Sequence, residues 1–178
     1  MLKKILIALV VVVAAFLGFV ATRPADYKIT RTATISAPPA AVFARVNDLT
    51  QWEAWSPWAK IDPAMKSTLE GPPAGVGAIY RWVGNSDVGE GSMTITESRP
   101  SELVRFRLEF LKPMAATSAA EFKFQPGGEQ TVVTWSMTGK NGFLEKAFCV
   151  FVDMDKMVGA DFEKGLAQLK ALLEAAPK

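Results

Sequence analysis

The stretch FLEKAFCVFVDMDKMVGADFEKGLAQLKALLE, residues 143–174, indicates how the rest of the chain must fold. Its apolar residues recur at steps of three, four or seven, which is the spacing of one face of an α-helix. They are Leu144, Phe148, Phe151, Val158, Phe162, Leu169 and Leu172. Lys156, Glu163 and Lys170 fall on the opposite, solvated face. We therefore predict one helix over residues 143–174, whose apolar face needs a large partner surface.

Two residues interrupt this apolar line. By their spacing, Asp155 and Gly165 both lie on the apolar face, where hydrophobic side chains are expected. A carboxylate that faces a core must be paired or have a raised pKa. A glycine inside a helix is favoured only where a neighbour approaches closely. We therefore expect a close neighbour at Gly165 and a specific role for Asp155.

The partner surface is predicted by alternating apolar and polar residues in the middle of the chain. The clearest case is LVRFRLEFL, residues 103–111, in which Val104, Phe106, Leu108 and Phe110 point to one side. A strand over residues 27–36 precedes two short helices, at residues 37–47 and 48–55. The other expected strands are residues 66–70, 78–84, 89–99, 119–125 and 131–138. Hairpin-length connections favour an antiparallel sheet with helices on one face, which is an α+β architecture.

The N-terminal segment ILIALVVVVAAFLGFVA, residues 5–21, contains no charge and follows Lys3 and Lys4. We interpret it as a transmembrane helix that stays attached; the alternative is a cleaved signal peptide, which would leave a secreted domain. The two lysines favour a cytoplasmic N-terminus and a domain outside the cytoplasm, periplasmic in a Gram-negative cell. Arg23 and Lys28, on the far side, weaken that orientation. The expected division is residues 1–25, anchor or signal with linker, and 26–178, the folded domain.

Composition excludes several kinds of function. The net charge of +2 equals the contribution of Lys3 and Lys4, so the remaining chain is balanced and lacks the basic excess of a nucleic-acid-binding protein. The sequence has no histidine and only Cys149, which excludes histidine-based catalysis and histidine- or multi-cysteine metal sites. Glycine-rich segments lack the ending of a phosphate-binding loop. We expect no metal, no cofactor and no nucleic-acid partner.

The segments APPAAVF (residues 37–43), VND (46–48) and WEAWSPW (52–58) carry a resemblance to a known family, as does MDKMVGADFE (154–163). They resemble the SRPBCC or polyketide cyclase/dehydrase family of the START and pollen-allergen superfamily, over about residues 27–174. The resemblance implies a helix-grip fold, in which a curved antiparallel sheet wraps around a long C-terminal helix and encloses an elongated apolar cavity. This superfold hosts both carriers and enzymes, so it does not define one function.

The inward faces of the predicted elements supply aromatic and methionine side chains suited to a small-molecule site. The expected ligand-binding residues are Tyr80, Trp82, Met93, Phe106, Phe122, Trp135, Met137, Phe151, Met154, Asp155 and Val158. The alternative is that each of these side chains simply fills the core.

Four polar or aromatic features have competing interpretations. Asp155 is either a ligand contact or acid catalyst, or a structural group paired with Arg81 or capping a loop. Trp52, Trp55 and Trp58 either gate the pocket or rest at a membrane interface, or form a hydrophobic lid over the core.

The leading functional hypothesis is a membrane-anchored domain that binds a hydrophobic small molecule or lipid. The alternative is a cyclase or dehydratase in which Asp155, Tyr80 or Arg81 polarises a carbonyl and moves protons. A third hypothesis is a module that binds a protein partner through a sheet edge or the tryptophans.

Overall fold

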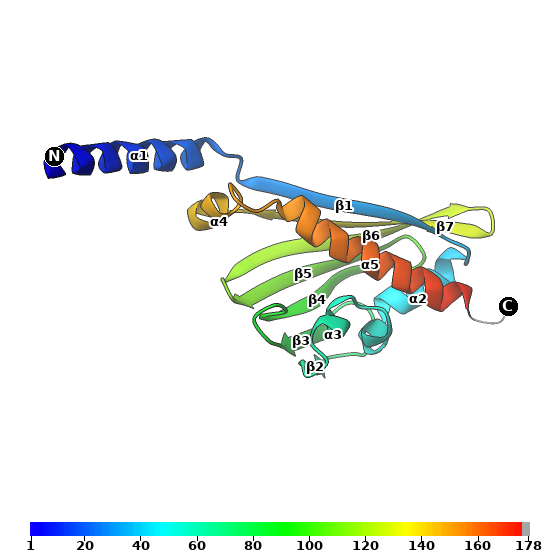
Figure 1. Cartoon of the computed structure of the whole chain (residues 1–178). Helices are drawn as coiled ribbons and strands as arrows, with labels where there is room; N and C mark the ends of the chain where they lie inside the picture. The colour runs from blue at the N-terminus through cyan, green and yellow to red at the C-terminus, as the bar shows by residue number, and fades with distance from the viewer. Residues whose placement is uncertain (176–178) are drawn as a thin grey trace.

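The structure is a computed structural model and describes residues 1–175. The helices are α1 (Leu2–Thr22), α2 (Pro39–Asn47), the 3₁₀ helix η1 (Leu49–Ala54), α3 (Trp58–Ile61), α4 (Phe143–Phe148) and α5 (Met154–Glu174). The strands are β1 (Asp26–Ile35), β2 (Lys66–Glu70), β3 (Ile79–Val83), β4 (Glu90–Arg99), β5 (Leu103–Lys112), β6 (Ala116–Gly127) and β7 (Gln130–Lys140). Figure 1 shows α5 lying across a curved sheet and α1 extending away from it.

All seven strands form one antiparallel sheet in the order β1-β7-β6-β5-β4-β3-β2. Strand β1 is the exception to simple hairpin order, because it pairs with β7, from Asp26 opposite Lys140 to Ile35 opposite Thr131. Six strands follow the short helices, as the alternating pattern predicts, and the expected α+β helix-grip architecture is confirmed. Helix α3 is one further turn that the sequence did not predict.

The hydrophobic core lies between the concave face of the sheet and the helical segments α2, η1 and α5. Trp135 of β7 is at its centre and stacks on Phe162 of α5, with ring centroids 4.0 Å apart. On its other side, Trp135 stacks on Phe122 of β6 at 4.6 Å. Trp52 of η1 meets Phe106 of β5 edge-to-face at 5.3 Å. These ring contacts fix both α5 and η1 to the sheet.

The prediction of one helix over residues 143–174 is wrong, because the helical hydrogen bonding stops after α4 and resumes at α5. The side chain of Asp153 accepts a hydrogen bond from the backbone N–H of Lys156 at 3.0 Å and so caps a new helix. Leu144, Phe148 and Phe151 therefore do not share the apolar face of α5. They are exposed, whereas Phe162 and Leu169 of α5 are buried.

Gly165 confirms the expectation of a close neighbour. A Cβ atom at this position would lie 2.8 Å from the ring of Trp135 and 3.1 Å from Pro57. The missing side chain thus lets α5 approach both β7 and the segment before α3. Gly165 is a packing residue at the centre of the grip.

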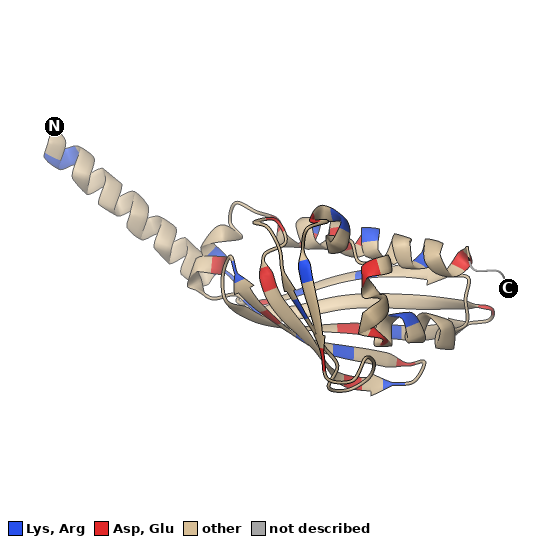
Figure 2. Ribbon diagram, turned by 90° about the horizontal axis from the view of Figure 1, so that it is seen from below, with Lys and Arg blue, Asp and Glu red and all other residues tan. Residues whose placement is uncertain are grey.

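Helix α1 is almost entirely exposed, apart from its C-terminal end, where Val20 is fully buried. Its 21 residues make it long and apolar enough to cross a bilayer, at about 30 Å. Figure 2 shows basic residues at its N-terminal end and none along the rest of its length.

Candidate functional site

The concave face of the sheet has a closed end and an open end. At the closed end, Val104, Phe122 and Trp135 occupy one cross-strand row and are each at most 2% exposed. At the opposite end, where α1 joins β1, several apolar side chains on the same face are only partly buried. We call this region the open end; its residues are Tyr80 and Trp82 of β3, Leu108 and Phe110 of β5, and Met154 and Val158 of α5. The open end is an accessible apolar surface inside the grip.

Two aromatic rings at this end cross a neighbouring strand at a glycine. The ring of Tyr27 on β1 lies over Gly139 of β7, where a Cβ would sit 2.6 Å from its hydroxyl oxygen. That hydroxyl and the Ser118 hydroxyl on β6 are hydrogen-bonded at 2.7 Å. The two glycines at these crossings let the rings lie along the sheet rather than stand away from it.

The second crossing involves Trp82 of β3, whose ring lies over Gly91 of β4, 2.6 Å from the position of a Cβ. The same ring meets Phe110 of β5 edge-to-face, with centroids 6.0 Å apart. The rings of Tyr27 and Trp82 therefore lie flat along the concave face at this end. A flat aromatic surface of this kind suits contact with an apolar molecule.

Tyr80 is a titratable group that faces this apolar surface. Burial raises the pKa of its hydroxyl, a hydrogen bond with Ser67 acts in the opposite direction, and the charge of Glu53 adds to the rise. The hydroxyl therefore stays protonated at neutral pH. It can donate or accept a hydrogen bond.

Apart from Asp155, the ligand-binding residues expected from the sequence divide into three groups. Phe106, Phe122, Trp135, Met93 and Met137 are buried within the core, and the first three are packed ring against ring. Tyr80, Trp82, Met154 and Val158 lie at the open end. Phe151 is 78% exposed, outside the grip.

The expectation that Asp155 faces the core is wrong. Its carboxylate is 60% exposed and accepts a hydrogen bond from Arg31 Nη2 at 3.0 Å. The hydrogen bond from Arg31, aided by the opposite charge, holds the pKa of Asp155 below its usual range although desolvation opposes the shift. Its partner is therefore Arg31 of β1, not Arg81.

The three candidate catalytic residues do not meet. Arg81 lies on the outer face of β3 and is paired with Glu70 at 2.8 Å, whereas Tyr80 faces inward. Asp155 is tied to β1, which is five strand spacings from β3, about 24 Å along the sheet. These side chains do not form a joint acid–base site.

The three tryptophans expected at the pocket mouth pack around the hydrophobic core. Trp52 is 5% exposed and Trp55 is fully buried, because both rings pack against Phe122 and Trp135. Trp58 is partly buried and meets Trp135 at 5.8 Å. The burial of Trp52 and Trp55 fits the hydrophobic lid over the core, whereas for the partly exposed Trp58 the pocket-gate and membrane-interface interpretations stay predictions.

Sequence reasoning left Leu108 and Phe110 of the open end out of the candidate site, and it also missed the neighbouring Tyr27 and the buried Ser118. The signal for Leu108 and Phe110 was present, because both belong to the alternation that places Phe106 inward. Tyr27 and Ser118 depend on the pairing of β1 with β7, which joins residues more than ninety positions apart. That pairing has no local signal in the sequence.

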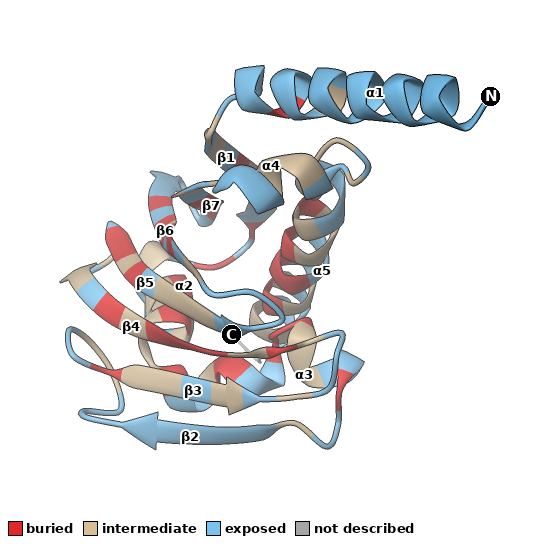
Figure 3. Ribbon diagram, turned by 90° about the vertical axis from the view of Figure 1, so that its left-hand side faces the viewer, coloured by how far each residue is buried: buried red, intermediate tan, exposed pale blue. Residues whose placement is uncertain are grey.

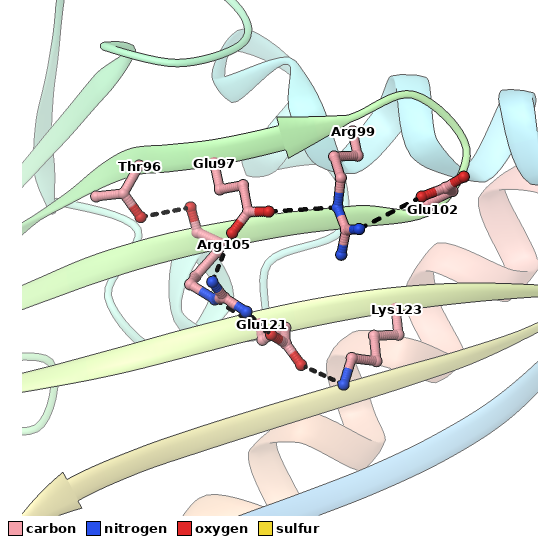
Figure 4. A network of polar contacts seen from close by, with 7 residues as sticks. All are labelled: Thr96, Glu97, Arg99, Glu102, Arg105, Glu121 and Lys123. Atoms are coloured by element: carbon pink, nitrogen blue, oxygen red, sulfur yellow. Dashed lines mark hydrogen bonds and ion pairs between the residues drawn. The ribbon is translucent and has the colours of Figure 1, made fainter.

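The outer face of the sheet carries a polar network, shown in Figure 4. A register shift between Ile95 and Glu97 turns Glu97 outward, where it pairs with Arg105 at 2.5 Å. Arg105 also binds Glu121 at 2.6 Å, and Glu121 binds Lys123 at 2.9 Å. A shallow hollow of about 420 Å³ lies beside Arg105 on this face. The sheet separates this network from the open end.

The architecture is that of the helix-grip class. A family model described as "Polyketide cyclase / dehydrase and lipid transport" matches residues 26–174, and the chain belongs to this family. No curated protein sequence matches it significantly.

Solved structures with the same fold include proteins of different origin. Protein CV1439 from Chromobacterium violaceum is 16% identical, with a TM-score of 0.62, over 84% of this chain and 98% of that one. The Aha1 dimer from Colwellia psychrerythraea is 16% identical, with a TM-score of 0.61, over 85% and 99%. Ara h 8.0201 is 11% identical, with a TM-score of 0.61, over 85% and 99%. At these identities the likeness shows the fold alone.

Proposed function

We propose that this protein binds a hydrophobic small molecule or a lipid at the open end of its helix grip, while α1 anchors it in a membrane. The observation that carries the proposal is the change in burial along the concave face. The aromatic layer around Trp135 fills the closed end, whereas apolar side chains such as Trp82 and Leu108 remain accessible at the open end. An accessible apolar surface beside a few polar groups is typical of a small-molecule site.

Two further observations support this function. The description of the family includes lipid transport. The C-terminal end of α1 is packed against the domain through the buried Val20, which favours a retained anchor over a cleaved signal. With Lys3 and Lys4 in the cytoplasm, the domain lies outside it. Retention of the full chain in the membrane after carbonate extraction tests the anchor.

A cyclase or dehydratase activity lacks a comparable observation, because Asp155, Tyr80 and Arg81 lie on different parts of the domain. The open end offers Tyr80 as a hydrogen-bonding group, which is sufficient for binding. The ligand is accordingly an apolar molecule with at most a small polar group near β3.

The test uses two tryptophan substitutions at adjacent positions of β5. Leu108→Trp adds bulk to the concave face at the open end, and Arg107→Trp adds the same bulk to the exposed outer face. We expect Leu108→Trp to reduce binding of anilinonaphthalene sulfonate by the detergent-solubilised full chain several-fold, while Arg107→Trp leaves it unchanged. Native mass spectrometry of gently purified protein should also detect a co-purified lipid in the unsubstituted chain. Equal probe binding by both variants, together with an empty protein, would contradict the proposal.

A further inference from the structure

Exposed apolar side chains gather at the end of the domain from which α1 extends. Helix α4 and the turn after it carry Phe143, Leu144, Phe148 and Phe151, whose exposed fractions are 43%, 72%, 48% and 78%. We call these four residues the α4 face. Apolar side chains concentrated in this way at a protein surface mark a contact with another protein or with a membrane.

The α4 face is fixed alongside the last third of α1. The ring of Phe151 contacts that of Phe16, with centroids 6.0 Å apart. Lys146 of α4 donates hydrogen bonds to the backbone oxygens of Ala21 and Arg23 at 3.1 and 3.2 Å. Figure 1 shows α4 next to the point where α1 leaves the domain. The position of α1 in a bilayer therefore determines the position of α4.

The depth of the Phe16–Phe151 contact in the bilayer indicates that the partner of the α4 face is lipid. Phe16 precedes the end of α1 at Thr22 by six residues, which is about 9 Å along the helix axis. The headgroup region on each side of a bilayer is roughly 5–8 Å thick. When α1 spans the bilayer, a side chain level with Phe16 reaches the acyl chains. Phe151 is level with Phe16, and its 78% exposure is then contact with lipid rather than with water.

The turn between β5 and β6 provides a second apolar contact at the same end. The register places Asp26 opposite Lys140, and Phe110 opposite Ala116, so this turn and the start of β1 lie at one end of the sheet. Leu111 and Met114 at this turn are 57% and 42% exposed. The α4 face and this turn thus form two separate apolar contacts that can lie on the membrane surface.

We infer that the α4 face inserts into the outer layer of the bilayer that α1 spans, and that it holds the open end of the grip against this membrane. The inference rests on the proposed anchor and goes beyond the proposed binding function, because it fixes the orientation of the domain. An apolar ligand would then pass between the leaflet and the open end without crossing bulk water.

The experiment places a fluorescent label at single cysteines in the full chain, in a Cys149→Ala background. Leu144→Cys tests the α4 face. Val76→Cys is the matched control, because Val76 is 60% exposed in the β2–β3 loop, at the other end of the sheet. Leu9→Cys reports on α1. The proteins are reconstituted in nanodiscs of phosphatidylcholine and phosphatidylglycerol with or without doxyl-labelled lipid, which quenches fluorophores that touch acyl chains.

We expect the label at position 144 to be quenched several-fold more than the label at position 76, and to approach the quenching at position 9. Strong quenching at position 9 with only background quenching at positions 144 and 76 would leave the anchor intact and overturn the inference. A label at 144 shielded from aqueous iodide but not quenched by lipid would indicate a protein partner and also overturn it. Absence of quenching at position 9 would remove the anchor itself. Binding of anilinonaphthalene sulfonate by the same samples reports separately on the proposed ligand site.

Discussion

The guanidinium group of Arg31 occupies the space that a side chain at Gly159 would need. A Cβ atom at Gly159 would overlap Arg31 Nη2 and Cζ, so the glycine creates the recess into which the arginine of β1 fits. Asp155 and Glu163, one helical turn before and after Gly159, bind the same guanidinium at 3.0 and 2.6 Å. These residues of α5 lie on one helix face at steps of four. They attach α5 to β1, one of the two edge strands of the sheet.

Substituting Gly159→Ala should destabilise the domain, although alanine favours helix more than glycine does. The added methyl group must displace Arg31 from its recess and break its ion pairs with Asp155 and Glu163, so we expect a modest fall in the free energy of unfolding. Denaturant unfolding followed by tryptophan fluorescence measures this change. Lys156→Ala, on the exposed side of α5, is the control and should have little effect. Helix propensity alone predicts a gain in stability with Gly159→Ala. Such a gain would contradict the conclusion that Gly159 is needed to accommodate Arg31.

Removing the Asp155 charge should lower the stability of the folded domain, and the size of this effect should depend on pH. The pKa of Asp155 is lowered in the folded state, chiefly by its hydrogen bond from Arg31, so its contribution to stability is present at neutral pH. That contribution disappears as the pH falls below the ordinary aspartate pKa of about 4 and through the lowered value. The difference in Tm between the unsubstituted chain and Asp155→Asn should therefore be modest at pH 7 and vanish in acid. A difference that persists at low pH would assign the effect to packing instead.

The sequence was sufficient to predict the α+β class, because its evidence is local, and the resemblance of residues 37–58 and 154–163 to a known family implied the helix-grip arrangement. Alternation in residues 103–111 and the turn residues between strands define an antiparallel sheet without knowledge of tertiary contacts. Gly165 could also be interpreted correctly, since a glycine inside an amphipathic helix itself indicates a close neighbour. Its neighbours, Trp135 and Pro57, required the structure.

Asp155 and the α4–α5 break were not predictable in the same way. Leu144, Phe148 and Phe151 keep helical spacing relative to Val158, so the apolar period continues across a stretch that does not continue as a helix. The spacing of Asp155 indicates a helix face but not the partner, and Arg31 lies 124 residues away in the chain. The contact of Tyr27 with Ser118 beside the open end depends equally on the pairing of β1 with β7, which no local pattern specifies.

The break between α4 and α5 leads to a prediction about Asp153. Its side chain caps α5 by accepting from the Lys156 N–H, and Asp153→Ala should cost about 0.5–2 kcal/mol of unfolding free energy. Asp153→Asn retains an accepting oxygen and should preserve most of the stability. The comparison is made by thermal unfolding of the full chain in one detergent. An equal loss in both variants would mean that the carboxylate charge, not the capping hydrogen bond, is required.

The concave face has a filled closed end and an accessible open end. We therefore expect substitutions of Trp135 and Trp82 to differ in their effects on stability and on binding. Trp135 is 2% exposed and stacked between Phe162 and Phe122, so Trp135→Ala leaves a cavity and should lower the unfolding free energy by about 3–5 kcal/mol. Trp82 is partly exposed and contacts Phe110 from one side, so Trp82→Ala should cost less stability.

Binding should show the reverse order for these two tryptophans. Trp82→Ala removes part of the surface on which the ligand rests, and we expect it to weaken binding of anilinonaphthalene sulfonate several-fold while the fold persists. A milder change at the other position, Trp135→Phe, keeps an aromatic ring in the core and should leave probe binding unchanged. Stability is measured by denaturant unfolding and binding by titration of the same preparations. If Trp135→Phe weakened binding and Trp82→Ala did not, the ligand would lie among the core rings, and the concave face would be a single cavity that opens by displacing them.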